Sequence, residues 1–90
     1  MIANQLLKSA TSIGANVSEA GAGQTKKDFV SKMAIASKEA RETGYWLKLI
    51  QAGDVFGVDV SLFLDEIDEI IKILTKIVKT SQANISKTQH

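Results

Sequence analysis

The chain has 90 residues, a net charge of +1, and neither cysteine nor proline. This length fits one small domain with a marginal core, and the lack of cysteine excludes disulfides, thiolate metal sites and thiol nucleophiles. No apolar run approaches the ~20 residues that cross a bilayer, and the opening segment lacks the features of a secretion signal. We therefore expect a cytoplasmic protein. Its β-branched residues recur at helical rather than alternating spacing, which predicts the all-α class.

The first helix is predicted over residues 2–20. Its main apolar stripe consists of Leu6, Ala10, Ile13 and Val17. Gly14 lies inside this helix among small side chains, at a cost of roughly 1 kcal/mol relative to alanine. Such a patch predicts a close approach of another helix. The alternative is a break near Thr11 and Ser12, because Ser and Thr favour caps and turns.

The middle helix is predicted over residues 25–53, with Thr25 as its N-cap and Gly53 at its end. One stripe has the spacing of a core contact: Phe29, Met33, Ala36, Ala40, Thr43 and Leu47. A second stripe lies on another face: Ile35, Glu39, Glu42, Trp46 and Leu49. An outer helix of a small bundle needs only one apolar stripe. The second stripe therefore predicts an interface with another copy of the chain.

The last helix is predicted over residues 59–80, with Asp59 as its N-cap. Its stripe is Phe63, Ile67, Ile70, Ile71, Leu74, Ile77 and Val78. Acidic residues occupy its N-terminal half and lysines its C-terminal half, which suits the helix dipole better than a cation site. Residues 1–80 are predicted to form the helical domain. Residues 81–90 are polar and aperiodic, and are predicted to be a disordered tail.

No residue set predicts an enzyme, a metal site or a cofactor. His90 is the single histidine and lies in the tail, so no two-histidine metal site can form. Glu39 and Glu42 have i,i+3 spacing, but no histidine accompanies them as di-iron sites require. Ion pairing or hydrogen bonding to a neighbouring chain is the preferred interpretation of these carboxylates, over acid–base catalysis. The glycines and lysines of GAGQTKK lack the preceding strand of a phosphate-binding loop.

A modest basic surface is predicted on the middle helix. It consists of Lys26, Lys27, Lys38, Arg41 and Lys48. Tyr45 lies among the last three, and contact with RNA or DNA phosphates is one interpretation. A solvated helix face is the commoner meaning of such a pattern.

Two segments, LLKSATSIGANVSEA and KKDFVSKMAIASKEARETGYWLKLI, resemble the family named for 23S rRNA intervening sequences. The first carries the element S-I-G-A-N-x-x-E, with Asn16 and Glu19, and the second carries K-E-A-R-E-T-x-Y-W. The resemblance implies an up-and-down four-helix bundle that forms a homopentamer, with no established enzymatic activity. It also implies kinship with accessory proteins of diversity-generating retroelements, which are strongly basic and bind nucleic acid.

Two departures from the family are expected, because the customary N-terminal helix is expected to be absent and the charge is not strongly basic. Three helices leave apolar surface uncovered, so we expect completion by self-association, as a pentamer or a helix-exchanged dimer. Ile35, Trp46 and Leu49 would pack between subunits, and Glu39, Arg41 and Glu42 would supply ion pairs. Asn16 and Glu19 would bond where the first helix meets its neighbours. The expected function is a non-enzymatic homo-oligomeric scaffold or adaptor, and the alternative is an RNA- or DNA-binding accessory protein.

Overall fold

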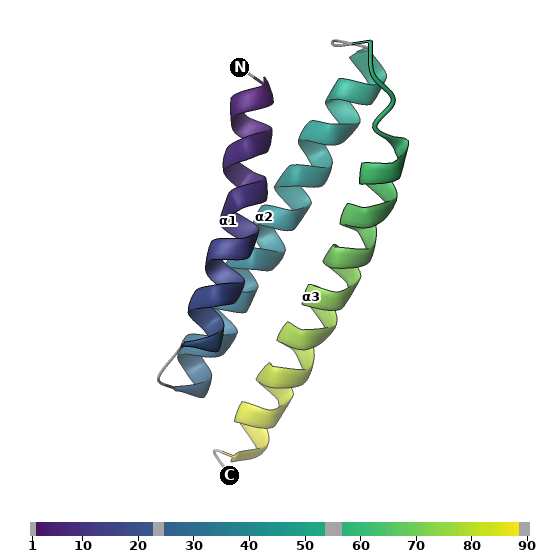
Figure 1. The fold of residues 1–90 in the computed structure, drawn as a ribbon. Helices are drawn as coiled ribbons and strands as arrows, with labels where there is room; N and C mark the ends of the chain where they lie inside the picture. The colour runs from purple at the N-terminus through teal and green to yellow at the C-terminus, as the bar shows by residue number, and fades with distance from the viewer. Residues whose placement is uncertain (1, 23–24, 54–56, 89–90) are drawn as a thin grey trace.

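Three α-helices and no strand make up the described part of the chain, residues 2–22, 25–53 and 57–88 of a computed structural model. The helices α1 (Ile2–Gly21), α2 (Lys26–Gly53) and α3 (Ser61–Thr88) run alternately up and down (Figure 1). The predicted all-α class and the three helices are confirmed. The alternative break in α1 is wrong, because the Thr11 hydroxyl donates to the Leu7 carbonyl at 2.8 Å and stays within the helix.

Side-chain caps mark the starts of α2 and α3. The Asp28 amide donates to Thr25 Oγ1 at 3.0 Å, as the predicted N-cap requires. Helix α3 begins at Ser61 rather than at Asp59, but the Asp59 carboxylate still accepts the Ser61 amide at 2.9 Å. Gln51 joins this cap to the end of α2, because the Val60 backbone amide donates to the side-chain oxygen Oε1 of Gln51 at 2.8 Å. Hydrogen bonds from the Ser61 hydroxyl, the Ser61 amide and Gln51 hold the pKa of Asp59 below its ordinary value.

The predicted tail is wrong for residues 81–88, which continue α3 as helix; residues 89–90 lie outside the described part. No glycine or proline interrupts residues 61–88, so nothing forces the helix to end earlier. Ile85 keeps the spacing of the core stripe and is half-buried. Ser81 and Asn84 line a small hollow together with Phe29 and Val30, so the end of α3 lies beside the start of α2. Packing against α2 therefore outweighs the polar composition of this segment.

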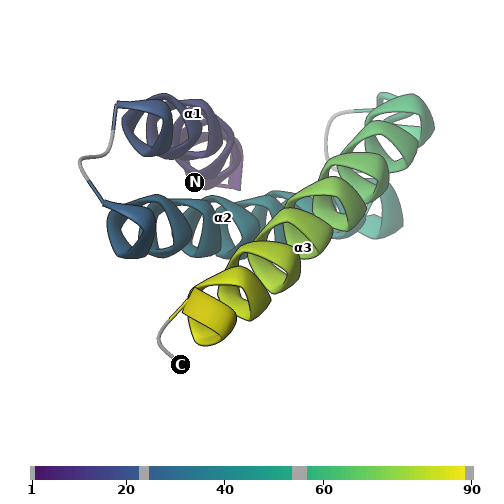
Figure 2. The same ribbon diagram turned by 90° about the horizontal axis from the view of Figure 1, so that it is seen from below.

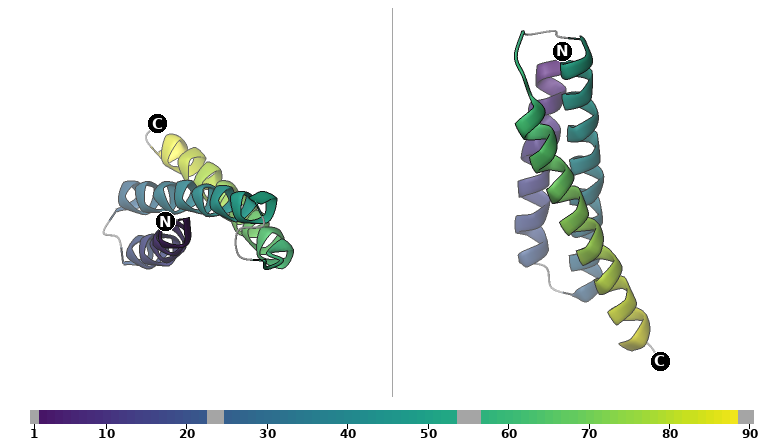
Figure 3. Two further views of the ribbon diagram at one scale, coloured as in Figure 1. Left: turned by 90° about the horizontal axis from the view of Figure 1, so that it is seen from above. Right: turned by 90° about the vertical axis from the view of Figure 1, so that its right-hand side faces the viewer.

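Helix α2 is the centre of the fold. Helices α1 and α3 each pack against it, whereas no described residue of α1 lies within 8 Å of α3 between Cα atoms. Seen from below and from above, α3 begins on the side of α2 where α1 lies and crosses to the other side at its C-terminal end (Figures 2 and 3). Helix α3 crosses α2 obliquely, and its C-terminal end extends beyond the α1–α2 pair (Figure 3). The three helices thus form an open arrangement rather than a closed three-helix bundle.

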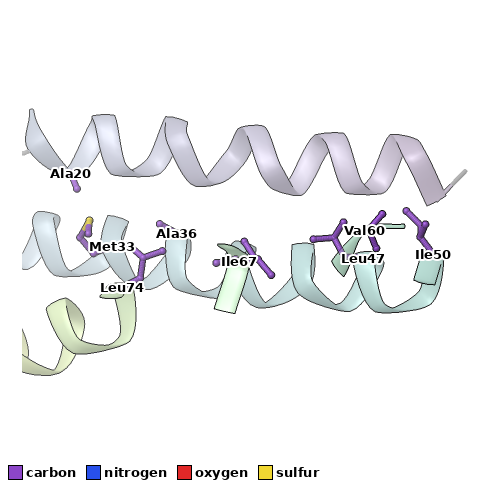
Figure 4. Close-up of a cluster of buried hydrophobic side chains, with 9 residues drawn as sticks. Ala20, Met33, Ala36, Leu47, Ile50, Val60, Ile67 and Leu74 are labelled. Carbon is purple, nitrogen blue, oxygen red and sulfur yellow. The ribbon is translucent and has the colours of Figure 1, made fainter. Parts of the chain in front are cut away.

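The core lies along the face of α2 that serves both neighbours (Figure 4). Ala36 and Ala40 are fully buried, and Met33, Leu47 and Ile50 are nearly so. The small side chains lie in the middle of α2 between larger ones toward its ends, which lets α1 and α3 approach the middle of α2 closely. The predicted core stripe of α2 is confirmed from Met33 to Leu47, and Phe29 at its start is half-buried.

A buried hydroxyl pair joins α1 to α2. The Thr43 hydroxyl lies 2.9 Å from Ser9 Oγ and 2.9 Å from the carbonyl oxygen of Glu39. The Ser9 hydroxyl also lies 3.1 Å from the Leu6 carbonyl oxygen. Because buried hydroxyls need partners, this pair fixes the relative position of the two helices.

The close helix approach predicted at Gly14 does not occur within the chain. A Cβ atom added to Gly14 meets no other atom within 4 Å, and the residue is exposed. The close approach is instead at Gly44, where a Cβ would lie 3.6 Å from Ile67 of α3. Gly14 faces open space because α1 packs on α2 through Leu6, Ser9 and Ile13.

Candidate functional site

An apolar groove lies between α1 and α3, and it is here called the α1–α3 groove. Its volume is about 480 Å³. Leu6 and Leu7 line it from α1, Phe63 and Ile70 from α3, and Leu47 and Ile50 form its floor. Thr43 and Glu66 are the polar residues among those that line it. Figure 4 shows Leu47 and Ile50 on α2 beside Val60.

The walls of the α1–α3 groove expose large apolar side chains to solvent. Leu7 is 64% exposed and Phe63 is 54% exposed. Phe63 and Ile70 were predicted as core residues of α3, and the structure leaves both exposed. The reason is that no Cα atom of α1 lies within 8 Å of one in α3, so no helix packs closely on this side of α3 among the described residues. Leu62 and Ile73, which the predicted stripe omitted, widen the same uncovered face of α3.

The second stripe of α2 lies on its other flank, beside α1. We call it the α2 flank stripe, and its members are Ile35, Glu39, Glu42, Trp46 and Leu49. Ile35 and Leu49 are more than one-third exposed, and Trp46 and Glu39 are half-buried. The stripe therefore presents a partly covered apolar strip with carboxylates between its apolar residues.

Trp46 combines a half-buried ring with an unsatisfied donor. Its indole N–H is buried and has no hydrogen-bond partner among the described residues. Tyr45 packs against it edge to face, with ring centroids 5.1 Å apart. A buried unpaired N–H carries a penalty of about 1–3 kcal/mol, so the position is held by packing rather than by hydrogen bonding.

Glu39 and Glu42 border a polar cleft between α1 and α2. The cleft has a volume of about 260 Å³, and Lys8, Ser12 and Lys38 also line it. None of these charged groups forms an ion pair with another among the described residues. The one ion pair in that part of the chain joins Glu19 to Lys32 at 2.8 Å. The charges of the α2 flank stripe are thus available to another molecule.

Arg41 lies on the α3 side of α2, whereas Glu39 and Glu42 lie beside α1. Its guanidinium donates to Thr75 of α3 at 2.9 Å and to Ser37 at 3.0 Å. These bonds place Arg41 on the α3 side of α2, away from the α2 flank stripe. Arg41 thereby bridges two helices within one chain.

The other two polar residues singled out in the sequence lie in α1. Asn16 donates to the Ser12 carbonyl oxygen at 2.8 Å, within its own helix. Glu19 pairs with Lys32 across the α1–α2 contact, and both side chains are well exposed. Exposed pairs of this kind stabilise a fold by about 0–1 kcal/mol.

Replacing Arg41 with glutamine is expected to lower the free energy of unfolding by about 0.5–1.5 kcal/mol, because the bond to Thr75 is lost. Urea unfolding followed by circular dichroism measures this change. Lys48→Gln is the matched control, since Lys48 is an exposed cation of α2 with no such contact. Equal stability of the two variants would contradict the bridging role.

All five predicted basic residues, Lys26, Lys27, Lys38, Arg41 and Lys48, are exposed. Tyr45 is 56% exposed and lies on the same outward side of α2 as Lys38 and Lys48. The structure therefore brings Lys38, Tyr45 and Lys48 together on one face, whereas Arg41 is engaged by Thr75.

No three His, Cys, Asp or Glu side chains within residues 2–22, 25–53 and 57–88 are grouped so that they could hold a metal ion. None of the three described helices is both long and apolar enough to span a membrane.

Sequence reasoning missed the α1–α3 groove as a site. Leu7, Leu62 and Ile73 are apolar residues outside the main stripes, and they indicate faces wider than one neighbour can cover. This widening of the apolar arc is visible in the sequence of α3. Which of its residues lack a neighbour depends on how far apart α1 and α3 lie.

Comparison with known proteins places these features in a family. No curated protein matches the sequence. A crystal structure of a protein of unknown function from the S23 ribosomal protein family of Bacteroides thetaiotaomicron is similar, with 39% identity and a TM-score of 0.81. The match covers 88% of this chain and 74% of that one, so about a quarter of the neighbour lies outside it. The profile of the 23S rRNA-intervening sequence proteins matches residues 1–76. The chain therefore belongs to the 23S rRNA-intervening sequence protein family.

Proposed function

We propose that this chain is a non-enzymatic scaffold that works as an assembly of its own copies. The observation that carries the proposal is the α1–α3 groove, an apolar hollow of about 480 Å³ between two helices whose Cα atoms stay more than 8 Å apart. Large exposed apolar patches on soluble proteins mark interaction sites. A groove between two helices has the shape that a further helix fills.

The energy available from covering this groove favours association. Complete burial of one large apolar side chain is worth about 1.5–3 kcal/mol. Leu7, Phe63 and Ile70 line the groove, and each is more than one-third exposed. Burying such a group in an interface would offset part of the cost of association, which is estimated at 4–15 kcal/mol.

The α2 flank stripe supplies a second surface on another side of the molecule. Its half-buried Trp46 is the type of residue that dominates binding energy at interfaces. Glu39 and Glu42 beside it have no ion-pair partner among the described residues, so they can fix the orientation of a neighbour. Two separate self-association surfaces allow assemblies larger than a dimer, including the pentamer that the family resemblance implies.

Light scattering after size exclusion tests the proposal on the unmodified chain. We expect one discrete mass that is a multiple of 9.7 kDa and persists on dilution to low micromolar concentration. Persistence follows from the apolar area that association buries. A folded monomer at all concentrations would contradict the proposal, because it would mean that the groove is stable when exposed to water.

A second candidate function is RNA or DNA binding through the outward face of α2. The observation that favours it is Tyr45, exposed between the exposed cations Lys38 and Lys48. Basic side chains around an exposed aromatic ring suit single-stranded nucleic acid.

If this face binds single-stranded nucleic acid, the affinity should fall steeply with salt, with a logarithmic slope of about −0.7 for each phosphate contacted. Fluorescence anisotropy with a labelled single-stranded oligonucleotide measures the slope. The double variant Lys38→Glu, Lys48→Glu should abolish binding. Lys72→Glu is the control, because it makes the same lysine-to-glutamate change at an exposed residue of α3. Binding that does not depend on salt would rule this function out.

A further inference from the structure

The outward face of α3 carries a strip of hydrogen-bond donors along the second half of the helix. We call it the α3 donor strip. Together with Ile71 it lines a hollow of about 410 Å³, and its members are Lys72, Thr75, Lys76, Lys79 and Thr80. Lys72 and Lys79 point about 160–180° away from Phe63 and Ile70 around the helix axis. A molecule that covers the α1–α3 groove therefore leaves these two lysines in contact with solvent.

Arg41 of α2 adds a further cation at the edge of the α3 donor strip. Its guanidinium donates to the Thr75 hydroxyl at 2.9 Å and to the Ser37 hydroxyl at 3.0 Å. A guanidinium carries five N–H donors, so these two bonds leave others unused. Arg41 is exposed, and its remaining donors are therefore open to a ligand beside Thr75.

The lysines of the α3 donor strip form no ion pair within the described part of the chain. Asp68 and Glu69 precede Lys72 by four and three residues, which is the spacing of ion pairs along a helix, yet neither pairs with it. Lys76 and Lys79 have no carboxylate three or four residues away in either direction. Their positive charges are therefore not compensated by the chain itself.

The helix dipole does not account for these lysines either. It stabilises cations within the last turn of a helix. A helix that ended at residue 80 would place Lys79 in that turn. Because α3 continues to Thr88, Lys79 lies more than two turns before its end and Lys72 more than four.

The two hydroxyl groups of the strip also keep an unused donor. In α1 and α2, the hydroxyls of Thr11 and Thr43 donate to the carbonyl oxygens four residues before them, at 2.8 and 2.9 Å. Thr75 makes no such bond, since its hydroxyl oxygen accepts from Arg41 and no described residue accepts its proton. The Thr80 hydroxyl has no hydrogen-bond partner among the described residues. The α3 donor strip is thus a row of donors that lack acceptors.

We propose that the α3 donor strip binds a short chain of phosphate groups that carries no bases, with tripolyphosphate as its simplest form. Ionised phosphate oxygens accept hydrogen bonds, and such charge-assisted bonds are roughly twice as strong as neutral ones. Linked phosphates present their negative charges in a row. Lys72, Lys76 and Lys79 present their positive charges in the same way, at steps of about 4.5–6 Å along α3.

The lining of the hollow favours this ligand over two others. Sites for single-stranded nucleic acid combine basic groups with aromatic rings on which bases stack, and no aromatic residue is among those that line this hollow. An acidic peptide brings side chains that need pockets, and Ile71 is the one large apolar residue in the lining. The inference goes beyond the proposed self-association, because it uses no residue of the α1–α3 groove or the α2 flank stripe.

Isothermal titration calorimetry with tripolyphosphate at constant ionic strength tests the proposal. The double variant Lys72→Gln, Lys79→Gln should weaken binding about tenfold or more, because two charge-assisted hydrogen bonds are lost. The double variant Lys26→Gln, Lys27→Gln is the matched control, since it makes the same change of net charge at exposed lysines of α2 and should weaken binding less than about threefold. Thr80→Val removes a hydroxyl that the chain does not use, and should weaken binding about threefold.

Three results would overturn the inference. The first is no heat of binding at millimolar tripolyphosphate. The second is equal weakening in the two double variants, because attraction would then follow net charge rather than the strip. The third is binding of oligothymidylate or oligoglutamate as tight as that of tripolyphosphate, which would assign the strip to nucleic acid or to an acidic peptide.

Circular dichroism should show the same helix content in every variant, because all the replaced side chains are exposed. The test is separate from that of the proposed function. A monomeric chain that binds tripolyphosphate through the α3 donor strip would contradict self-association and support this inference. An oligomer that does not bind it would do the reverse.

Discussion

Replacing Leu47 with alanine is expected to lower the free energy of unfolding by about 2–4 kcal/mol, the range for large-to-small core substitutions. Leu47 is 6% exposed and lies on α2 at the floor of the α1–α3 groove. Its loss would enlarge an existing hollow that neither α1 nor α3 can close without leaving α2. For a domain of this size the loss is a large part of total stability. Urea unfolding followed by circular dichroism, at one fixed chain concentration, measures it.

Leu49→Ala is the matched control, because it makes the same change two residues further along α2. Leu49 is 37% exposed, so the expected loss in chain stability is below about 1 kcal/mol. The two residues point about 200° apart around the helix, toward different surfaces. Equal losses in the two variants would contradict the observed orientation of α2 between its neighbours.

The placement of Leu47 illustrates what the sequence could predict. The stripe from Met33 to Leu47 is buried as its spacing indicates, because the repeat of an apolar side chain every three or four residues is a property of the helix itself. The same holds for Thr25, whose cap depends on residues within one turn. The geometry of a single helix was therefore sufficient to predict the core stripe and the cap.

Contacts between helices were beyond sequence reasoning. Phe63 and Ile70 have the spacing of core residues, but spacing cannot tell whether another helix lies opposite them. The bond from Arg41 to Thr75 joins residues 34 positions apart, and so does the contact between Thr43 and Ser9. Such pairs depend on the distance and rotation of whole helices, which no local pattern records.

The prediction of a disordered tail was wrong for residues 81–88, because it relied on their polar composition. Their polar side chains suggest disorder, yet a helix that already exists extends at little cost when no glycine or proline intervenes. Ile85 then falls in line with the buried face of α3. The end of α3 is therefore decided by the neighbouring α2 more than by its own residues.

Replacing Trp46 with alanine is expected to weaken self-association at least about 30-fold, which corresponds to the 2 kcal/mol or more of an interface hot spot. Trp46 is the largest apolar group of the α2 flank stripe, and its unpaired buried N–H contributes nothing to the stability of the chain. Light scattering across a dilution series measures the change. Lys48→Ala truncates an exposed side chain of α2 outside the stripe, and should weaken association less than threefold.

Association must be separated from folding in this test, since Trp46 is half-buried within its own chain. Circular dichroism at the same concentrations shows whether the Trp46→Ala chain keeps its helix content. If it does not, Leu49→Ala serves instead, because its side chain belongs to the same stripe and contributes little to the fold. Loss of mass with helices intact, in either variant, would assign the α2 flank stripe to the interface. An unchanged mass in a folded Trp46→Ala chain would leave the α1–α3 groove as the surface that holds the copies together.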